Sequence, residues 1–343
     1  MLKTGYLHLS NKQIFSGNLL NWNDQAISGE VVFNTAMAGY VESLTDPSYS
    51  NQILVFTYPL IGNYGVQLKD FESAKIQVRG VIMNQISLHP NHADSSKSLS
   101  EWLSTQKIPI LYNVDTRALT LHLRSKGVMG GIITNTESRQ TFEKLEHEFI
   151  SVKKPKVYNP KSKKKIFLVD CGVKENIIKS IVEYDVQVIR VPHNYDYTNE
   201  DYDGVLLSNG PGDPTAYTET IAITKKAMSS GKSVFGICLG SQIMGLSAGA
   251  RTYKLRFGHR GQNQPCKVEG WDRCYITSQN HGYALDEKTL PKGWKVLFRN
   301  LNDNSIEGIE HASKPFFSVQ FHPEAKPGPT DTAWLFERFV KSL

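Results

Sequence analysis

The sequence predicts an α/β protein in which a doubly wound, mostly parallel sheet in the C-terminal half follows a mixed α/β N-terminal domain. Two observations indicate this class. After residue 165, short apolar runs alternate with helix-like stretches, a rhythm typical of parallel sheets covered by helices. Before residue 150, β-like runs bounded by Gly, Asn and Pro prevail. We therefore divide the chain into residues 1–150, a basic linker at 151–165, and a C-terminal domain at 166–343.

The N-terminal segment contains extended runs and one capped helix. Its β-like runs are 30–34, 52–58, 80–83 and 131–134. A helix is expected at 98–106, where Ser98 or Ser100 would cap the first turn. We identify no catalytic motif and no repeat in this segment, which we expect to dock a partner.

The C-terminal segment alternates strands with helices. Strands are expected at 165–170, 186–191, 204–208, 233–237 and 316–321. Helices are expected from residue 174, at 217–229 and at 239–248. Continuous apolar runs suit strands that are buried on both faces. Ligand sites in such sheets lie beyond the carboxyl ends of the strands, where the motifs of this sequence fall.

The positive charge of the chain is concentrated in one stretch. The formal net charge is +6, and lysines are densest between residues 153 and 165. A polyanion site is one interpretation, but no nucleic-acid fold motif surrounds the cluster. We interpret the stretch as a solvated basic linker and expect no nucleic-acid partner.

Composition and cysteine usage restrict the class further. A length of 343 residues suits about two domains, and a 40% hydrophobic fraction is ordinary for a globular protein. No run is long enough to span a bilayer and the N-terminus has no apolar signal-peptide core, so we expect a cytoplasmic protein without a membrane partner. The four cysteines are scattered, which argues against a disulfide framework. The His and Cys residues lack metal-ligand spacing, so no metal is expected in this chain.

Residues 236–240, Gly-Ile-Cys-Leu-Gly, predict a nucleophile elbow. They form the thiol counterpart of G-x-S-x-G, between an apolar strand and a helix-like stretch. The glycines allow a sharp turn that projects Cys238, and a helix N-terminus favours the reactive thiolate. A buried structural cysteine is the alternative, but strand, turn, helix and both glycines together favour a nucleophile. We interpret the other three cysteines as inert thiols; a site-facing position of Cys171, which also follows a strand, is the alternative.

His322 and Glu324 are the expected partners of this nucleophile. They follow the predicted strand at 316–321, and residues two apart on an extended segment project to the same side. Glu324 would hold His322 in one tautomer while His322 takes the thiol proton. A histidine beside a carboxylate is common, and the pair becomes informative because the cysteine elbow precedes it.

Two loops complete the expected site. Residues 208–214, Ser-Asn-Gly-Pro-Gly-Asp-Pro, form a rigid turn whose backbone N–H groups would stabilise an oxyanion together with that of Leu239. A phosphate cradle and a plain structural turn are the alternatives, although neither glycine-rich phosphate motif is present. Residues 278–283, Ser-Gln-Asn-His-Gly-Tyr, offer amide and backbone partners for an amino-acid substrate.

These four motifs, in this order, resemble a class I, triad-type glutamine amidotransferase domain that extends from about residue 165 to the C-terminus. The resemblance implies Cys238 as nucleophile, His322 as general base and acid, and Glu324 as its orienter. Glutamine would form a γ-glutamyl thioester and release ammonia, and water would then release glutamate.

The N-terminal segment is similar to that of carbamoyl-phosphate synthase small subunits, so the resemblance spans nearly the whole chain. It is carried by 29–35, 39–40, 45–50 (Thr-Asp-Pro-Ser-Tyr-Ser), 57–63 (Thr-Tyr-Pro-Leu-Ile-Gly-Asn), 115–120 and 257–261. It implies L-glutamine as substrate and a large partner subunit, in a heterodimer or higher assembly, that uses ATP and Mg to make carbamoyl phosphate from bicarbonate for arginine and pyrimidine synthesis. It implies no cofactor in this chain. By position it implies glutamine contacts at Ser48, Gly210, Gly212, Leu239, Gln242, Asn280, Gly282 and Tyr283.

Some positions depart from that family, and two rival interpretations stay open. The departures are Ser241, Arg260, Gln262 and Gln264, none of them in the triad. They would mark a divergent branch with altered partner contacts or glutamine affinity. One rival is an amidotransferase for another synthetase, such as anthranilate or GMP synthesis, and the N-terminal motifs weigh against it. The other is a catalytically silent docking subunit, and the intact triad weighs against that.

Overall fold

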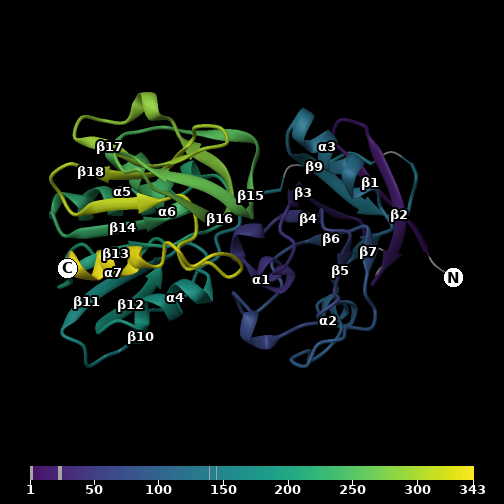
Figure 1. Cartoon of the computed structure of the whole chain (residues 1–343), viewed down its shortest axis with the longest axis horizontal. Coiled ribbons are helices and arrows are strands. Elements are labelled where there is room, and N and C mark those ends of the chain that lie inside the picture. Colours follow the sequence, from purple (N-terminus) through teal and green to yellow (C-terminus); the bar gives the residue numbers. More distant parts are fainter. Residues whose placement is uncertain (1–2, 22–24, 139, 144) are drawn as a thin grey trace. The chain divides into compact units, whose positions relative to one another are not determined.

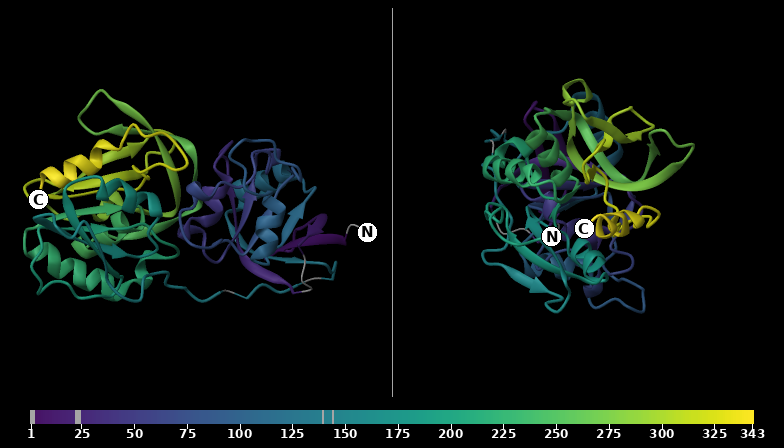
Figure 2. Two further views of the ribbon diagram at one scale, coloured as in Figure 1. Left: turned by 90° about the horizontal axis from the view of Figure 1, so that it is seen from below. Right: turned by 90° about the vertical axis from the view of Figure 1, so that its left-hand side faces the viewer.

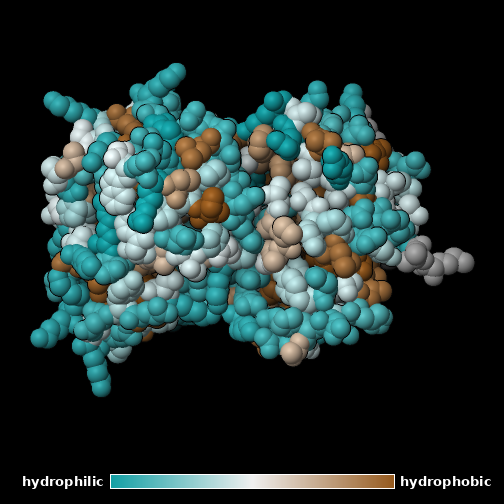
Figure 3. All heavy atoms as spheres, viewed as in Figure 1, coloured by the Kyte–Doolittle hydropathy of each residue, from teal (hydrophilic) through white to brown (hydrophobic). Residues whose placement is uncertain are grey.

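The computed structural model describes residues 3–21, 25–138, 140–143 and 145–343. The chain divides into two compact units, Met1–Glu148 and Phe149–Leu343 (Figure 1). No helix of the described residues has the length and apolar character needed to cross a membrane. On the face drawn in Figure 3 hydrophilic residues prevail, and apolar side chains occur in scattered groups.

The first unit is built around a closed barrel in the order β1-β2-β8-β6-β4-β3-β9. Its strands are β1 Lys3–Leu9, β2 Ile14–Leu20, β3 Ile27–Asn34, β4 Gln52–Phe56, β6 Gly80–Ile82, β8 Ile110–Tyr112 and β9 Met129–Thr134. The run β3-β4-β6-β8 is parallel and the other pairings are antiparallel. Two short strands, β5 Leu60–Ile61 and β7 Gln85–Ile86, pair beside it.

The helices of the first unit are α1 Tyr40–Thr45, α2 Leu99–Thr105 and α3 Thr116–Lys126, with short 3₁₀ turns at Pro47–Tyr49 and Leu68–Asp70. The start of α2 was predicted from the sequence, and Ser98 rather than Ser100 is its cap. Ser98 Oγ accepts the Glu101 N–H at 3.2 Å, and the Glu101 carboxylate accepts the Ser98 N–H at 2.9 Å. This reciprocal capping box satisfies two N–H groups at the helix start.

The second unit contains one sheet in the order β10-β12-β11-β13-β14-β19-β18-β17-β15-β16. Its strands are β10 Lys156–Tyr158, β11 Lys164–Asp170, β12 Val186–Pro192, β13 Gly204–Leu207, β14 Ser233–Ile237, β15 Thr252–Val268, β16 Cys274–Leu285, β17 Trp294–Asn300, β18 Ile306–His311 and β19 Phe316–Val319. From β12 to β19 neighbouring strands are parallel, which confirms the predicted fold class. The other half is antiparallel and ends in the long, curved pair β15 and β16 (green in Figure 2).

Helices cover both faces of the parallel half. They are α4 Glu175–Val182, α5 Thr218–Ser229, α6 Leu239–Ala248 and α7 Trp334–Lys341, with 3₁₀ turns at Pro214–Ala216 and Glu287–Thr289. Alternate side chains of β11 point to opposite faces of the sheet and pack against different helices. Ile166 and Leu168 pack with α4 and α7, whereas Phe167 and Val169 pack with α5 and α6. A strand that is apolar at every position is therefore buried on both sides.

The stretch 151–165, which we expected to be a linker, belongs to the second unit. Residues 156–158 form β10, an edge strand that pairs antiparallel with β12, and Lys164 already lies in β11. Ahead of them, Ser151 Oγ donates a hydrogen bond to the Asp170 carbonyl at 2.6 Å. The segment lacks apolar alternation because β10 is mostly exposed and buries no apolar face. Lysines on an edge strand also discourage pairing with other chains.

Candidate active site

Cys238 stands at the sharp turn between β14 and α6. Its backbone has φ 54° and ψ −106°, a conformation that is strained for a residue with a side chain and that turns the sulfur out of the strand direction. The Cys238 N–H donates to the Val319 carbonyl of β19 at 2.8 Å, which fixes the turn to the neighbouring strand. A side chain at Gly240 would collide with the backbone of Leu207, so this glycine is required for α6 to begin so close to the sheet.

The structure brings His322 and Glu324 together beside this turn. The chain leaves the sheet after Val319, and the His322 N–H donates to the Ser278 carbonyl at 2.9 Å. The His322 Nδ1–H then donates to Glu324 Oε1 at 2.7 Å. Both side chains are at least 98% buried, so the contact between His322 Nδ1 and the carboxylate is shielded from solvent. The carboxylate therefore fixes the tautomer in which Nε2 is available to the thiol.

The charges of Glu324 and Cys238 favour the protonated form of His322. Burial of His322 opposes the imidazolium, but the charges of Glu324 and Cys238 outweigh burial and raise the pKa of His322 to about 10. Nε2 makes no well-aligned hydrogen bond to any described atom, but Cys238 raises the pKa of His322 both through its charge and as a hydrogen-bond partner. Catalytic contacts are often long before substrate binds. An imidazolium beside the sulfur stabilises the negative charge that the attacking sulfur requires.

Lys174, which the sequence analysis did not single out as a site residue, holds Glu324. It is 3% exposed, and its ammonium donates to Glu324 Oε1 at 3.0 Å and to the carbonyls of Ala325 at 2.7 Å and Lys326 at 2.8 Å. Burial favours the neutral form of Glu324, but the charges of Lys174 and His322 lower its pKa to about 2. The orienter is therefore ionised at neutral pH. Asn176 also donates to the Glu324 carbonyl, so the start of α4 anchors the whole loop.

The turn after β13 lies against the start of α6, next to Cys238. A side chain at Gly210 would collide with the Cys171 backbone and with the Leu239 side chain, so the turn and the start of α6 are in close contact. Asn209 is fully buried and its Oδ1 accepts the Lys174 N–H at 3.0 Å. Gly212 has φ +83°, a left-handed conformation suited to glycine. Donation from this turn and from Leu239 N–H to an oxyanion stays a prediction.

The strand β16 runs past the nucleophile and carries the predicted substrate residues Asn280, Gly282 and Tyr283. The Cys238 thiol donates to the Asn280 carbonyl at 3.7 Å. The buried Gln242 of α6 donates its amide to the Tyr283 carbonyl at 2.9 Å. Asn280 thus lies next to the sulfur and Gln242 holds the same strand at Tyr283, although contact of these residues with glutamine itself stays a prediction.

The remaining predicted contact, Ser48, belongs to the first unit. It is buried in the 3₁₀ turn Pro47–Tyr49, and its N–H donates to Asp46 Oδ1 at 2.9 Å. Its part in glutamine binding stays a prediction.

Three of the positions that depart from the expected family pattern form hydrogen bonds within the second unit. Ser241 is buried and shares a 2.8 Å hydrogen bond with Ser318, which ties α6 to β19. Arg260 donates to the Phe257 carbonyl at 2.7 Å. Gln264 accepts a hydrogen bond from Asn302 Nδ2 at 3.0 Å. Gln262 lies in β15.

The other cysteines differ from Cys238 in their surroundings. Cys171 is fully buried, and burial together with Asp170 raises the pKa of its thiol well above the usual range. It therefore packs behind the turn after β13 as an inert thiol. Burial and Glu307 likewise raise the pKa of the Cys266 thiol. Cys274 is exposed and far along the antiparallel half from the elbow.

We predict that a glutamine-like electrophile, such as a chloroketone analogue, labels Cys238 much faster than the other cysteines. Cys238 lies beside His322 and at the N-terminus of α6, two positive partners for an attacking sulfur, whereas burial raises the pKa of the Cys171 and Cys266 thiols. Time-resolved peptide mapping measures the label, with Cys238→Ser as the control. Label on exposed Cys274 at an equal rate would show that accessibility, and not activation, governs the reaction.

A cysteine–histidine–carboxylate triad at the carboxyl ends of parallel strands, beside a glycine-rich turn, defines the chain's second unit as a class-I glutamine amidotransferase. The family model "Glutamine amidotransferase class-I" matches residues 167–342. A second model, "Carbamoyl-phosphate synthase small chain, CPSase domain", matches residues 7–133. The chain belongs to the carbamoyl-phosphate synthase small-chain family.

Curated relatives agree with this assignment. The carbamoyl phosphate synthase small chain of Pyrococcus furiosus is 42% identical over 366 residues, which cover 99% of this chain and 98% of that protein. The arginine-specific small chain of Neurospora crassa is 43% identical, with 96% and 78% covered. Multifunctional protein CAD of Squalus acanthias is 47% identical over 98% of this chain, which spans only 16% of that protein's length.

Proposed function

We propose that this chain hydrolyses L-glutamine and supplies ammonia to a carbamoyl-phosphate synthase large chain. The observation that carries the proposal is the contact of His322 Nδ1 with Glu324 Oε1 at 2.7 Å beside the strained Cys238. This arrangement provides a sulfur nucleophile, an imidazole whose Nε2 faces the sulfur, and a buried carboxylate that holds the imidazole in that tautomer. Membership of the small-chain family supports the same role.

In the proposed reaction, the Cys238 sulfur attacks the side-chain amide carbon of glutamine and forms a tetrahedral intermediate. The N–H of Leu239 and the turn that carries Gly210 would donate to its oxygen. The C–N bond breaks as His322 gives a proton to the leaving nitrogen, so ammonia departs and a γ-glutamyl thioester remains. Water then gives a proton to His322 and attacks the thioester, which releases glutamate and restores the thiol.

The residues around the sulfur suit an amino-acid substrate. Gln242 holds the Tyr283 carbonyl at 2.9 Å, so the strand that carries Asn280 and Gly282 is fixed relative to α6. The side chains of this chain suffice for amide hydrolysis, and we propose no cofactor for that step.

The partner would perform the remaining chemistry. Membership of the small-chain family supports a large-chain partner. That large chain would consume ATP with Mg²⁺ and bicarbonate. The product, carbamoyl phosphate, would serve arginine and pyrimidine synthesis, and the first unit would dock the partner in a heterodimer or higher assembly. We also propose a cytoplasmic location, because four free cysteines suit a reducing compartment.

Reconstitution tests the choice of partner. Purified full-length chain mixed with a carbamoyl-phosphate synthase large chain, glutamine, bicarbonate and ATP should form carbamoyl phosphate, because the matching first unit is present. Mixed instead with the synthetase subunits of GMP or anthranilate synthesis, the same chain should give no glutamine-dependent product. Glutamine-dependent product with either of those subunits, and not with the large chain, would contradict the proposal. Binding to the large chain without glutamine hydrolysis would indicate a docking subunit.

A further inference from the structure

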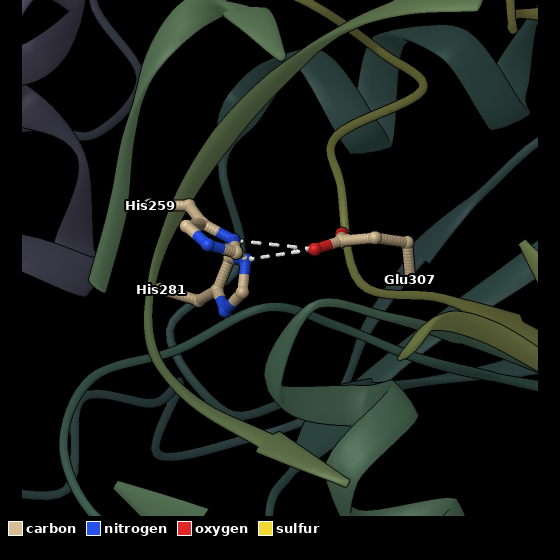
Figure 4. A group of neighbouring side chains, drawn as sticks. All are labelled: His259, His281 and Glu307. Carbon is tan, nitrogen blue, oxygen red and sulfur yellow. Dashed lines mark hydrogen bonds and ion pairs between the residues drawn. The ribbon is translucent and has the colours of Figure 1, made fainter. Parts of the chain in front are cut away.

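A second cluster of titratable side chains lies in the antiparallel half of the second unit. His259 of β15, His281 of β16 and Glu307 of β18 converge in the interior (Figure 4), with exposed fractions of 8%, 4% and 0%. The proposed hydrolysis makes no use of these three residues. Because charged and polar groups are costly to bury without partners, their convergence calls for a physical reason.

The outer contacts of the two histidines fix their tautomers. His281 Nδ1 lies 2.8 Å from the Tyr283 carbonyl, which can only accept, so this nitrogen carries the proton and Nε2 has the lone pair. His259 Nε2 lies 2.9 Å from Asp303 Oδ2 and donates to it, so Nδ1 of the neutral ring also has a lone pair. Histidine metal ligands are usually held in this way, with the far nitrogen bound to a carbonyl or a carboxylate.

Three electron-rich atoms therefore face one gap. His259 Nδ1 lies 3.2 Å from His281 Nε2 and 3.2 Å from Glu307 Oε1, and His281 Nε2 lies 3.6 Å from Glu307 Oε1. If His259 Nδ1 carried a proton, it could donate a hydrogen bond. No hydrogen would then lie between His281 Nε2 and Glu307 Oε1, which are both acceptors. A single cation between all three atoms satisfies every contact at once.

The spacing is that of a tetrahedral metal centre. Zinc binds nitrogen and oxygen at about 2.0–2.2 Å, and the ligand atoms of such a tetrahedron lie about 3.3–3.6 Å apart. The three measured separations fall close to this range. A fourth acceptor is nearby, because Gln279 Oε1 lies 3.3 Å from His281 Nε2 while its amide nitrogen donates to Glu307 Oε2 at 3.0 Å.

We propose that His259, His281 and Glu307 bind one divalent transition-metal ion of the Zn²⁺ class, with Gln279 Oε1 or water as the fourth ligand. Two imidazoles and one carboxylate suit zinc better than the oxygen-seeking Mg²⁺ or Ca²⁺. The expectation of a metal-free chain rested on sequence spacing, which does not reveal ligands drawn from three different strands. The site is enclosed, so its role is structural.

The ion would brace the strand that presents the substrate residues. His281 lies in β16 between Asn280, whose carbonyl accepts the Cys238 thiol, and Gly282. Tying His281 to β15 and β18 would limit the movement of that strand. A metal at this site therefore stiffens the wall of the glutamine pocket and takes no part in the bond changes.

The test is metal stoichiometry in the full-length chain. Chain freed of metal with a chelator is incubated with Zn²⁺ or Co²⁺ and desalted, and retained metal is measured by mass spectrometry and by Co²⁺ absorption. One equivalent is expected in the unaltered chain, in Cys238→Ser and in His89→Asn, a control that removes an exposed histidine. His259→Asn and Glu307→Gln should lose stoichiometric binding. Asp303→Asn, which removes a carboxylate that holds His259 and Ser305 but is not itself a proposed ligand, should bind about 10–100-fold more weakly.

Other results would overturn the site. No retained metal in the unaltered chain would mean that a proton alone fills the gap. Equal retention by a folded His259→Asn chain would place the metal elsewhere. Loss of the metal in Cys238→Ser, or thiolate charge-transfer absorption with Co²⁺, would place it at the triad. Thermal unfolding of each variant shows whether it is folded, and Asp303→Asn keeps the test decisive if a ligand variant does not fold.

Discussion

Cys238→Ser in the assembled enzyme is expected to lose glutamine-dependent carbamoyl phosphate synthesis by several orders of magnitude, as for other covalent nucleophiles. Ammonium-dependent synthesis should stay near that of the unaltered enzyme. The reason is the division of labour: the triad only breaks an amide bond, and free ammonia enters after that step. His322→Ala should behave in the same way, because the thiol loses its base and the leaving nitrogen loses its proton donor.

The measurement is a paired assay with glutamine or ammonium chloride as nitrogen source, on complexes whose assembly is checked by size-exclusion chromatography. Cys274→Ser is the matched control, since it removes an exposed thiol and should leave both activities unchanged. Equal loss with both nitrogen sources would mean that Cys238 supports the interface or the partner's chemistry. Unchanged activity with both would leave the chain without a catalytic role.

Lys174→Met is expected to destabilise the second unit by about 3–5 kcal/mol, because it leaves the carboxylate of Glu324 buried without its cation. Both side chains of this pair are at most 4% exposed, so solvent does not screen it. Denaturant unfolding measures the cost. Lys226→Met is the matched control: its pair with Asp196 is about half exposed, and its loss should cost about 1 kcal/mol or less. Equal costs for the two variants would contradict the role of Lys174.

The pH dependence separates this charge effect from lost packing. Because the pKa of Glu324 is lowered to about 2 from an ordinary 4.5, its contribution to stability is complete above pH 4.5 and is lost as pH falls toward 2. Without Lys174 the folded pKa rises, so the loss should occur at higher pH. The double variant Lys174→Met/Glu324→Gln should recover part of the stability, because it removes the stranded charge. A double variant no more stable than Lys174→Met would mean that packing dominates.

The parts of the site that follow from local pattern could be predicted from the sequence. The strand, glycine and helix signals around Cys238 lie within about sixteen residues and determine the elbow. His322 and Glu324 are two residues apart, so their contact follows from an extended backbone. The parallel sheet was likewise predictable, because most of its strands are short apolar runs that alternate with helix-like stretches.

Features that depend on distant pairing could not be predicted. Lys174 looks like an ordinary lysine before a helix, and its partner Glu324 lies 150 residues further along the chain. His259, His281 and Glu307 come from three strands whose pairing the sequence does not specify. The closure of the first unit's barrel depends on the parallel run from β3 to β8, and β10 is a strand only because β12 offers its edge.

The main-chain hydrogen bonds of the triad bear on how this protein can change over evolutionary time. The N–H groups of Cys238 and His322 are bound to the carbonyls of Val319 and Ser278, at 2.8 and 2.9 Å. The spacing of nucleophile and base is thus a property of the backbone and persists whichever side chains occupy the two positions. A descendant that lost its sulfur would keep the same scaffold and could go on binding a partner. Catalysis and assembly can therefore be lost separately, by single codon changes.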